Sequence, residues 1–481
     1  MDIDRIAIIG AGACGLGVTK KVELLPYLLA EQKFKTITIF EQRDQPGGVW
    51  NYTGDEGTGP NAIPVPQPRP SSEPQQPVNG TFISPVYDSL ETNIPSSMMQ
   101  FCDFPFPAGT ALFPSHIVVK EYLHRYAEEL RDVIKFQTLV LDVSVSARHP
   151  RTEWTVTWRD LQTNQVSDAK FDAVIVANGH HNDPNVPVIP GLAEWDQMYP
   201  GSIIHSSLYR RPDPFTNKKV IVVGHSASGI DIASQISEVS QHPLLISERT
   251  KTTLSPEKAA VAKSLPEIIL LDPMNRRVLF ANEHEERDVD CIVFCTGYHF
   301  SLPFLSSLQP SIITDGLRPH NLYRHVFYTP EPTLALIGFQ QRIVPFVISQ
   351  AQGAWVARVF SGRLDLPPHA EMQHWIEEWK AVRGDGRNFN VFGFPLDAEY
   401  INSLHNTSST AVRRDGLEND GSGRISPFWG AKDKWTRERV PLIKKASQAL
   451  GSRRKDITRL EEIGFKFEES LEDTELNKAH L

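Results

Sequence analysis

Three glycines directly follow an apolar run near the start of the chain, in the stretch IAIIGAGACGLG. Gly10, Gly12 and Gly15 match the spacing G-x-G-x-x-G, and Ala13 and Cys14 lie between the last two. In this pattern the first glycine makes a tight turn, the second lets a pyrophosphate approach the backbone, and the third lets a helix pack on a strand. Because a single match to this pattern is weak evidence, the elements around it must show whether it marks a nucleotide site.

The order of elements around these glycines is that of a dinucleotide-binding unit. We expect a buried strand at 5–9, a helix at 16–30 that Pro26 kinks, and a second strand in KTITIFEQ, 35–42. Glu41 ends that second strand, where an acidic side chain accepts hydrogen bonds from the ribose hydroxyls of an adenosine. This context predicts a nucleotide site at the start of the chain.

A second copy of the pattern, VIVVGHSASGIDIA, occupies residues 220–233. Gly224 and Gly229 take the first and third positions, and Ser226 replaces the middle glycine. The repeat predicts two dinucleotide sites in one chain. We expect contacts to the second nucleotide from Gly224, His225, Ser226, Ala227, Ser228 and Gly229.

The next strand, in LISERT, indicates which nucleotide the second site takes. Ser247 and Arg249 stand where a unit that binds NAD would carry an acid, and they suit a 2′-phosphate, so NADPH is favoured over NADH. Glu248 lies between them and is expected to point to the opposite face of the strand.

Two further apolar segments, FDAVIVANGHH and VDCIVFCTGYHF, end as parallel strands that run into a glycine. Thr296 and Gly297 follow the second strand, at the edge where open α/β sheets place ligands, and we expect them to contact NADPH. His180 and His181 follow the first strand, and we interpret them as turn residues because no other potential metal ligand shares a suitable spacing with them.

The composition favours a small-molecule partner. The chain of 481 residues is longer than a single domain usually is, and apolar residues make up 40% of it and charged residues 22%. Its net charge of −9 does not favour binding to nucleic acid or to an anionic membrane. The four cysteines form neither a disulfide framework nor a zinc pattern. We expect reduced thiols, no bound metal, no signal peptide, no membrane-spanning segment and a cytoplasmic location.

Taken together, the motifs resemble those of the flavin-containing monooxygenases, in their soluble fungal or yeast-like form. FEQRDQPGGVW is similar to the family's FAD segment, FCTGY to its F-A-T-G-Y element, and YPGSIIHSSLYR to its signature, matched by Gly201, His205 and Tyr209. The likeness extends from about residue 3 to about residue 365. Tyr209 favours this family over its Baeyer–Villiger relatives, whose signature ends in tryptophan.

The resemblance implies further site residues. VYDSLETNIPSSMMQFCDFPFP is similar to the segment over the flavin, so Asn93 becomes the catalytic candidate, and Gln352 matches a position near the flavin on a helix that Pro345 begins. The FAD residues expected in this way are Gly10, Gly12, Ala13, Cys14, Gly15, Glu41, Gln42, Gly48, Val49, Trp50, Thr92, Asn93 and Gln352. His205 is expected to shape a linker between domains, with its ring nitrogens satisfied.

The motif order predicts an α/β fold with two Rossmann-like domains, the NADPH domain inserted into the FAD domain. We place the first FAD-binding part at 1–212, with an irregular surface insertion at 53–81, the NADPH domain at 213–332, and the second FAD part with a helical C-terminal region at 333–481. The active site is expected in the crevice between the domains. Solvated helices or a frayed tail are expected at the C-terminus.

The implied reaction is NADPH- and O2-dependent oxygenation of a soft nucleophile, sulfur or nitrogen, through a C4a-hydroperoxyflavin. Baeyer–Villiger oxidation and N-hydroxylation stay open as alternatives, as does a flavin-binding protein without turnover. A disulfide reductase fits poorly, because Cys291 and Cys295 lie in an apolar strand without a C-x-x-C pair. The substrate and the oligomeric state, a homodimer included, are not determined by the sequence.

Overall fold

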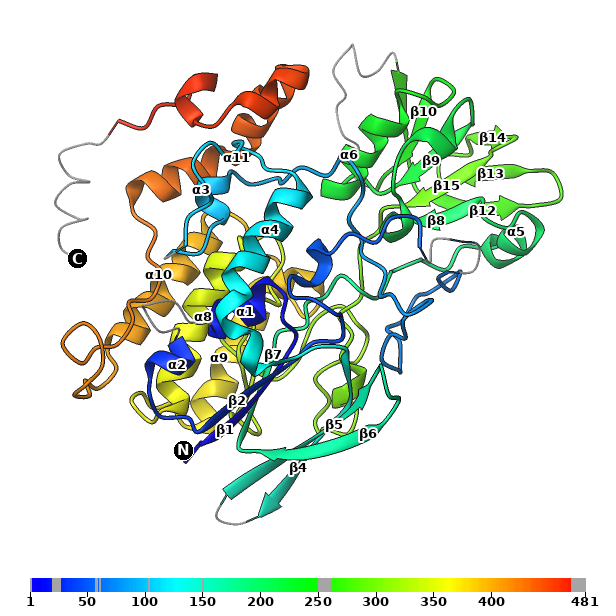
Figure 1. Cartoon of the computed structure of the whole chain (residues 1–481). Coiled ribbons are helices and arrows are strands. Elements are labelled where there is room, and N and C mark those ends of the chain that lie inside the picture. Colours follow the sequence, from blue (N-terminus) through cyan, green and yellow to red (C-terminus); the bar gives the residue numbers. More distant parts are fainter. Residues whose placement is uncertain are drawn as a thin grey trace. The chain divides into compact units, whose positions relative to one another are not determined.

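The chain forms two compact units, each assembled from separate segments (Figure 1). The computed structural model describes residues 2–19, 27–56, 59, 62–102, 104–148, 151–249 and 261–468. Unit 1 comprises Met1–Asn51, Glu91–Gly179 and Leu302–Leu481, and unit 2 comprises Tyr52–Leu90 and His180–Ser301.

Unit 1 is built on a seven-stranded sheet, with strand order β16-β17-β18-β7-β1-β2-β3. Its centre is parallel: Ile6 of β1 lies opposite Ile37 of β2 and Ala173 of β7. The predicted strands at 5–9 and within 35–42 are therefore confirmed as β1 and β2. The strands are β1 (Arg5–Ile9), β2 (Thr36–Phe40), β3 (Ile134–Lys135), β7 (Ala173–Val176), β16 (Leu322–Tyr323), β17 (Phe327–Tyr328) and β18 (Leu334–Leu336).

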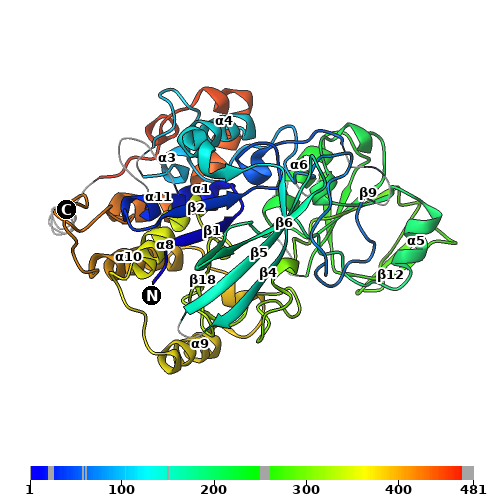
Figure 2. The same cartoon turned by 60° about the horizontal axis from the view of Figure 1, so that its bottom comes forward.

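Two helices pack tightly against each other beside this sheet, and they lie together in both views (Figures 1 and 2). Helix α1 (Ala13–Thr19) begins three residues before the expected start, and α8 (Pro345–Phe360) begins at the predicted proline. A Cβ on Gly17 would lie 2.3 Å from Oγ of Ser349, so glycine allows the close approach. Pro26, the expected kink, lies outside the described residues.

The remaining elements of unit 1 surround that core. An antiparallel meander contains β4 (Thr138–Arg148), β5 (Arg151–Asp160) and β6 (Val166–Phe171). The helices are α2 (Tyr27–Ala30), α3 (Ser96–Met99), α4 (His116–Ala127), α9 (His369–Arg383), α10 (Leu396–Ser409) and α11 (Ala431–Ala449).

The C-terminal region is more than the solvated helices expected from its charge pattern. Tyr400, Ile401 and Leu404 of α10 are buried in the main hydrophobic core, and α10 packs against α8. The apolar residues at helical spacing face inward, together with Asp397, whose buried carboxylate pairs with Nε of Arg437 at 2.6 Å. The last residues, 469–481, lie outside the described part of the chain.

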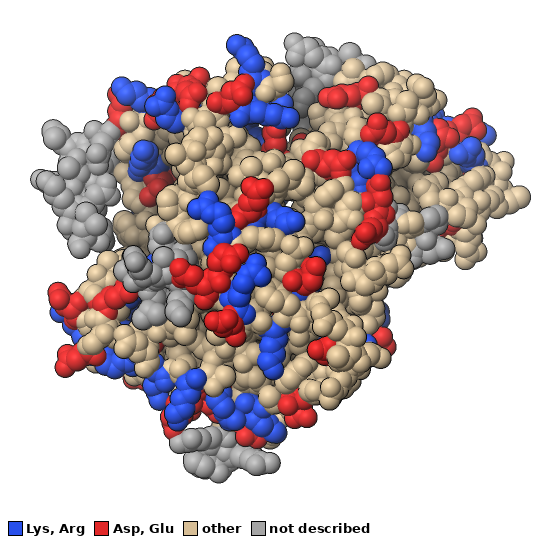
Figure 3. All heavy atoms as spheres, viewed as in Figure 1, with Lys and Arg blue, Asp and Glu red and all other residues tan. Residues whose placement is uncertain are grey.

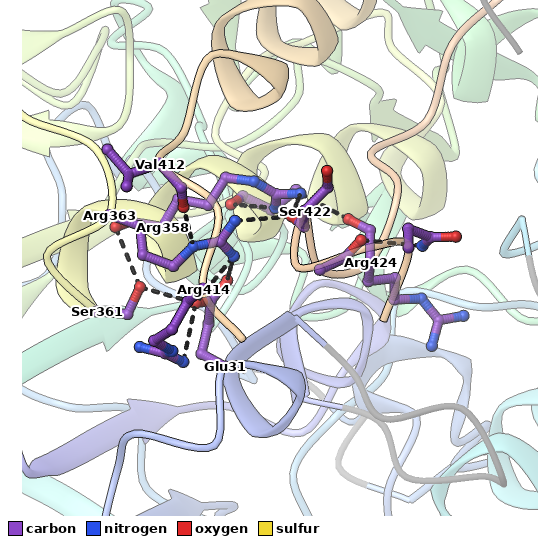
Figure 4. A network of polar contacts seen from close by, with 11 residues as sticks. Glu31, Arg358, Ser361, Arg363, Val412, Arg414, Ser422 and Arg424 are labelled. Atoms are coloured by element: carbon purple, nitrogen blue, oxygen red, sulfur yellow. Dashed lines mark hydrogen bonds and ion pairs between the residues drawn. The ribbon is translucent and has the colours of Figure 1, made fainter. Parts of the chain in front are cut away.

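A buried ionic network joins segments that are far apart in the sequence (Figure 4). Glu31 accepts hydrogen bonds from Nη1 of Arg363 at 3.0 Å and Oγ of Ser361 at 2.9 Å, and Nη2 of Arg414 lies 3.5 Å from its Oε2. Nη2 of Arg358 donates to the carbonyl of Arg424 at 2.7 Å. Removal of one partner would leave a buried charge unpaired, so the network holds the loop after α10 against the end of α8.

Unit 2 contains a five-stranded parallel sheet with order β11-β10-β9-β15-β8 and an antiparallel three-stranded sheet. The parallel strands are β8 (Ile203–His205), β9 (Val220–Val223), β10 (Leu244–Ser247), β11 (Ala262–Leu265) and β15 (Cys291–Phe294). The antiparallel strands are β12 (Ile268–Asp272), β13 (Arg277–Phe280) and β14 (Glu285–Arg287), and the helices are α5 (Leu192–Met198) and α6 (Ala227–Ile236). The predicted α/β fold with parallel sheets is thus observed.

The unit boundaries differ from the expected positions 213 and 332. Residues 52–90 and 180–212 pack in unit 2, because β8 pairs with β15 and Gln67 forms a bridge with Val186. The expected insertion at 53–81 is irregular where it is described, but Ile63 and Val65 pack against the apolar core of unit 2.

Basic and acidic side chains are interspersed on the face in Figure 3, where no large basic patch gathers. Within the described part of the chain, no helix combines the length and apolar character needed to cross a bilayer.

Candidate active site

The first glycine turn, Gly10–Gly15, connects β1 to α1 in a conformation that requires glycine. Gly10 has φ +102°, and a Cβ on it would lie 2.8 Å from the carbonyl oxygen of Ala177. A Cβ on Gly15 would lie 1.9 Å from the oxygen of Gly10 itself. Real Cβ atoms do not approach backbone oxygens so closely, so the helix can begin this near the strand only with glycine at both positions.

Glu41 closes this turn from the end of β2. Its Oε2 accepts from the backbone N–H of Ala11 at 2.7 Å and its Oε1 from that of Arg43 at 2.9 Å. The side chain is 4% exposed, and burial raises the pKa of its carboxyl above the usual value despite these bonds. The carboxylate thus holds the turn in place, and its expected contact with a ribose stays a prediction.

A second pair of glycines packs on the first turn. The N–H of Gly47 donates to the carbonyl of Ala11 at 2.9 Å, and a Cβ on Gly48 would lie 3.1 Å from Cα of Gly12. The 3-10 helix η1 (Gly48–Trp50) continues with Val49 and Trp50. The two turns therefore contact each other through backbone atoms, which is an arrangement that fits the pyrophosphate of FAD.

The second glycine turn, Gly224–Gly229, has the same geometry between β9 and α6 in unit 2. Gly224 has φ +96°, its Cβ would lie 2.6 Å from the oxygen of Cys295, and a Cβ on Gly229 would lie 2.1 Å from the oxygen of Gly224. Ser226 is the N-cap residue of α6, which starts with Ala227 and Ser228. This turn fits a second dinucleotide, and its expected contact with NADPH stays a prediction.

The side chain of Glu248 points in a different direction from the one expected from the sequence. Instead of pointing to the opposite face, its Oε2 lies 3.2 Å from Nδ1 of His225 in the glycine turn, and its Oε1 accepts from Oγ of Ser264 at 2.6 Å. Strand β10 ends at Ser247, so the alternation of faces does not carry over to the next residue.

The two residues expected to bind a 2′-phosphate lie in different environments. Ser247 is 2% exposed and donates from Oγ to the carbonyl of Pro266 at 3.0 Å, whereas the side chain of Arg249 is 88% exposed. Arg249 therefore lies outside the core and is accessible to a ligand, and the hydroxyl of Ser247 has a protein partner.

The signature residues pack around the end of β15. Nε2 of His205 donates to the carbonyl of Gly297 at 2.9 Å, and its Nδ1 accepts from the N–H of Ser207 at 3.1 Å. This fully buried ring is held neutral, since burial lowers the pKa of His205 to about 4. Thr296 donates from Oγ1 to the carbonyl of Asn185.

Tyr209 and Gly201 complete the signature inside unit 2. The hydroxyl of Tyr209 donates to Oε1 of Gln235 in α6 at 3.0 Å, and its ring centre lies 5.4 Å from that of Tyr87. Gly201 has φ +81° in a turn before β8. The signature thus fastens the parallel sheet to α6.

Asn93, the catalytic candidate, lies in unit 1 with the first glycine turn. Its side chain is exposed, whereas Thr92 is 4% exposed and donates from its N–H to the carbonyl of Pro114 at 2.9 Å. The same segment continues into Phe101, whose ring would lie 3.1 Å from a Cβ on Gly17 in α1. The segment is therefore packed against the helix that begins at the first turn.

Gln352, which is expected near the flavin, is held by hydrogen bonds to other parts of unit 1. Its side chain is fully buried; its Oε1 accepts from the N–H of Gly338 at 2.8 Å, and its Nε2 donates to the hydroxyl of Tyr400 at 3.0 Å. A Cβ on Gly338 would lie 2.3 Å from Sγ of Cys14. Gln352 thus positions a turn that packs on α1, and its expected place near the flavin stays a prediction.

Sequence reasoning did not identify Glu248, Tyr400 or Lys444 as parts of these sites. Lys444 of α11 donates from Nζ to the carbonyl of Thr92 at 2.7 Å. The periodic alternation of charge in the C-terminal region gives no signal for such a contact. Among the described residues, no group of three or more side chains is arranged to hold a metal ion.

Comparison with known proteins agrees with this geometry. The model of the "Flavin-binding monooxygenase-like" family matches residues 76–258 and 266–412. Flavin-containing monooxygenase FMO GS-OX3 of Arabidopsis thaliana is 31% identical over 451 residues, covering 87% of each chain, and flavin-containing monooxygenase ustF2 of Aspergillus flavus is 29% identical, covering 88% of this chain and 95% of its own.

Among solved structures, S-allyl-L-cysteine S-oxygenase from Allium sativum superposes with a TM-score of 0.75 at 27% identity and full coverage of both chains. Members of the family are oxidoreductases that use FAD and NADPH. The predicted fold and cofactors are confirmed at this level, and the chain belongs to the flavin-containing monooxygenase family.

Proposed function

We propose that this protein transfers one oxygen atom from O2 to the sulfur or nitrogen of a small molecule, with unit 1 binding FAD and unit 2 binding NADPH. For a thioether, the thioether, O2, NADPH and a proton give the sulfoxide, water and NADP⁺. The observation that carries the proposal is the presence of two glycine turns with matching close contacts, one in each unit. The bound flavin supplies the redox and oxygen-transfer chemistry.

Asn93 is assigned as the catalytic residue. Its amide can donate and accept hydrogen bonds without offering an acidic proton, so it could hold a nucleotide amide and a reactive oxygen in place without expelling hydrogen peroxide. The exposed side chain next to the buried Thr92 supports this role.

The substrate class is drawn from the relatives and from Tyr209. The Allium relative is named as an S-oxygenase of S-allyl-L-cysteine, which is a thioether. Tyr209 stands where the Baeyer–Villiger relatives have tryptophan. A soft sulfur or nitrogen nucleophile is therefore favoured over a ketone.

The test follows NADPH consumption with a thioether, a tertiary amine and cyclohexanone, with products checked by mass for one added oxygen. Sulfoxide or N-oxide formation is expected. Lactone formation from cyclohexanone alone would replace the proposal with Baeyer–Villiger oxidation, and a protein that binds FAD but oxidises no NADPH would exclude both. Asn93→Asp is expected to raise the hydrogen peroxide released per NADPH.

A further inference from the structure

Residues in the C-terminal part of the chain contact the segment that carries Asn93. Lys444 on α11 donates from Nζ to the carbonyl oxygen of Thr92 at 2.7 Å, and its ammonium lies 4.4 Å from the ring centre of Phe113. That carbonyl belongs to the peptide bond that joins Thr92 to Asn93. Because a peptide unit is planar and trans, fixing its oxygen also fixes the direction of the Asn93 N–H.

A second contact holds the preceding residue. Nε of Arg454 lies 2.8 Å from Oε2 of Glu91, and the side chains are 31% and 15% exposed. Glu91 in turn forms a bridge with Ser115 before α4. An ion pair of partly buried groups with one well-placed nitrogen is stronger than an ordinary surface pair.

An apolar cluster fastens the C-terminal segment to the same place. The N–H of Leu112 donates to the carbonyl of Ile457 at 2.7 Å, while Ser96, three residues after Asn93, donates from its N–H to the carbonyl of Leu112 at 2.8 Å. The cluster comprises Leu112, Phe113, Ile443, Ile457, Leu460, Ile463 and Phe465. It places Lys444 and Arg454 against the segment by burial, independently of their charges.

The family match ends at residue 412, before α11 begins. The contacts to Glu91 and Thr92 therefore come from a part of the chain that the family model does not describe. Burial, two charge-assisted hydrogen bonds and a backbone bond converge on a few residues around Asn93, while the Asn93 side chain itself stays exposed.

We propose that Lys444 and Arg454 are positioning residues that hold Asn93 in the orientation needed for coupled oxygen transfer. The proposal rests on the role assigned to Asn93 above. Loss of Lys444 releases the Thr92 carbonyl, so the Asn93 side chain samples other orientations and more of the NADPH consumed yields hydrogen peroxide instead of product. Thr92 and Asn93 are themselves expected FAD residues, but neither contact is made to the first glycine turn, so flavin content is expected to stay unchanged.

The experiment compares Lys444→Met with Lys444→Arg in the full-length holoenzyme, with Lys445→Met as the matched control, since Lys445 is the exposed neighbour on the same helix. Amide hydrogen exchange in the peptide that contains Glu91–Pro95 and hydrogen peroxide released per NADPH are both measured. Lys444→Met is expected to speed exchange roughly tenfold and to raise the peroxide fraction severalfold, at unchanged flavin content. Lys444→Arg restores both values, and Lys445→Met matches the wild type.

The double variant Asn93→Ala with Lys444→Met separates this inference from the proposed function. Its peroxide fraction should equal that of Asn93→Ala alone, because Lys444 acts through Asn93. If Asn93→Ala uncouples and Lys444→Met does not, the positioning role is wrong and the role of Asn93 stands. If Asn93→Ala leaves coupling unchanged, both fail. Arg454→Met repeats the test if Lys444→Met does not fold.

Discussion

The two glycine turns repeat one backbone geometry on two different sheets. The third glycine approaches the oxygen of the first to nearly the same extent in both, with Cβ distances of 1.9 Å at Gly15 and 2.1 Å at Gly229. The acids after the neighbouring strands differ: Glu41 accepts two backbone N–H bonds, whereas Glu248 faces His225. Glycines thus fix the path of the backbone in both turns, whereas the acid beside each turn contacts different protein groups.

The largest effect is expected from alanine at the third glycine of each turn. A Cβ about 2 Å from a backbone oxygen forces the helix away from the strand. Gly15→Ala should purify without flavin, whereas Gly229→Ala should keep FAD but be reduced by NADPH at least about a hundredfold more slowly, the equivalent of about 2.7 kcal/mol. Flavin absorbance and anaerobic reduction measure the two effects. Colourless Gly229→Ala protein would show that the turns are not independent.

Glutamine at position 41 should have the next largest effect. One of the two backbone N–H donors would then face an NH2 group instead of an oxygen, which leaves a buried donor unpaired. We expect the free energy of unfolding to fall by about 1–3 kcal/mol and flavin affinity to weaken. Urea unfolding and flavin titration check this; stability equal to the wild type would mean that Glu41 does not support the turn.

The pH response should distinguish the two units. His205 has a pKa of about 4 in the folded state and near 6.5 when unfolded, so the unfolded chain gains the proton first as the pH falls. Its contribution to stability is complete above pH 6.5 and decreases by about 2 kcal/mol between pH 7 and pH 5. For Glu41, whose pKa is raised, the sign is opposite, because the folded state keeps its proton to higher pH.

The measurement is urea unfolding of the wild type and of His205→Gln at pH 7 and pH 5. The variant is expected to show a smaller loss of stability on acidification, whatever its stability at pH 7. An unchanged slope would assign the acid sensitivity to other groups.

The smallest expected effect concerns Glu248. Its carboxylate lies beside His225 in the turn that would receive an adenosine ribose, so it opposes a 2′-phosphate that Arg249 attracts. Glu248→Gln should bind 2′,5′-ADP about fivefold more tightly, and 5′-AMP, which lacks the 2′-phosphate, with unchanged affinity. Calorimetric titration measures both affinities. An equal gain in affinity for 2′,5′-ADP and 5′-AMP would show that Glu248 does not act by repelling the 2′-phosphate.

The sequence predicts the two turns well, because glycine spacing and apolar strands determine local geometry. It does not predict the direction of Glu248, since periodic alternation ends with the strand at Ser247. Nor does it predict the partners of Gln352 or Lys444, which depend on tertiary packing between residues far apart in the chain, such as Tyr400 and Thr92. The domain boundaries expected at 213 and 332 rest on the order of the motifs. The boundaries of the two observed units instead depend on which strands pair, as β8 does with β15.

The 352 positions that separate Thr92 from Lys444 along the chain also separate them in time during synthesis. A ribosome releases the first glycine turn long before it has made α11, and N-terminal parts of a chain generally fold first. Until α11 has been made, the carbonyl of Thr92 lacks its Lys444 partner. If Asn93 has the role proposed above, a chain that ends before α11 is expected to release more hydrogen peroxide per NADPH than the full chain.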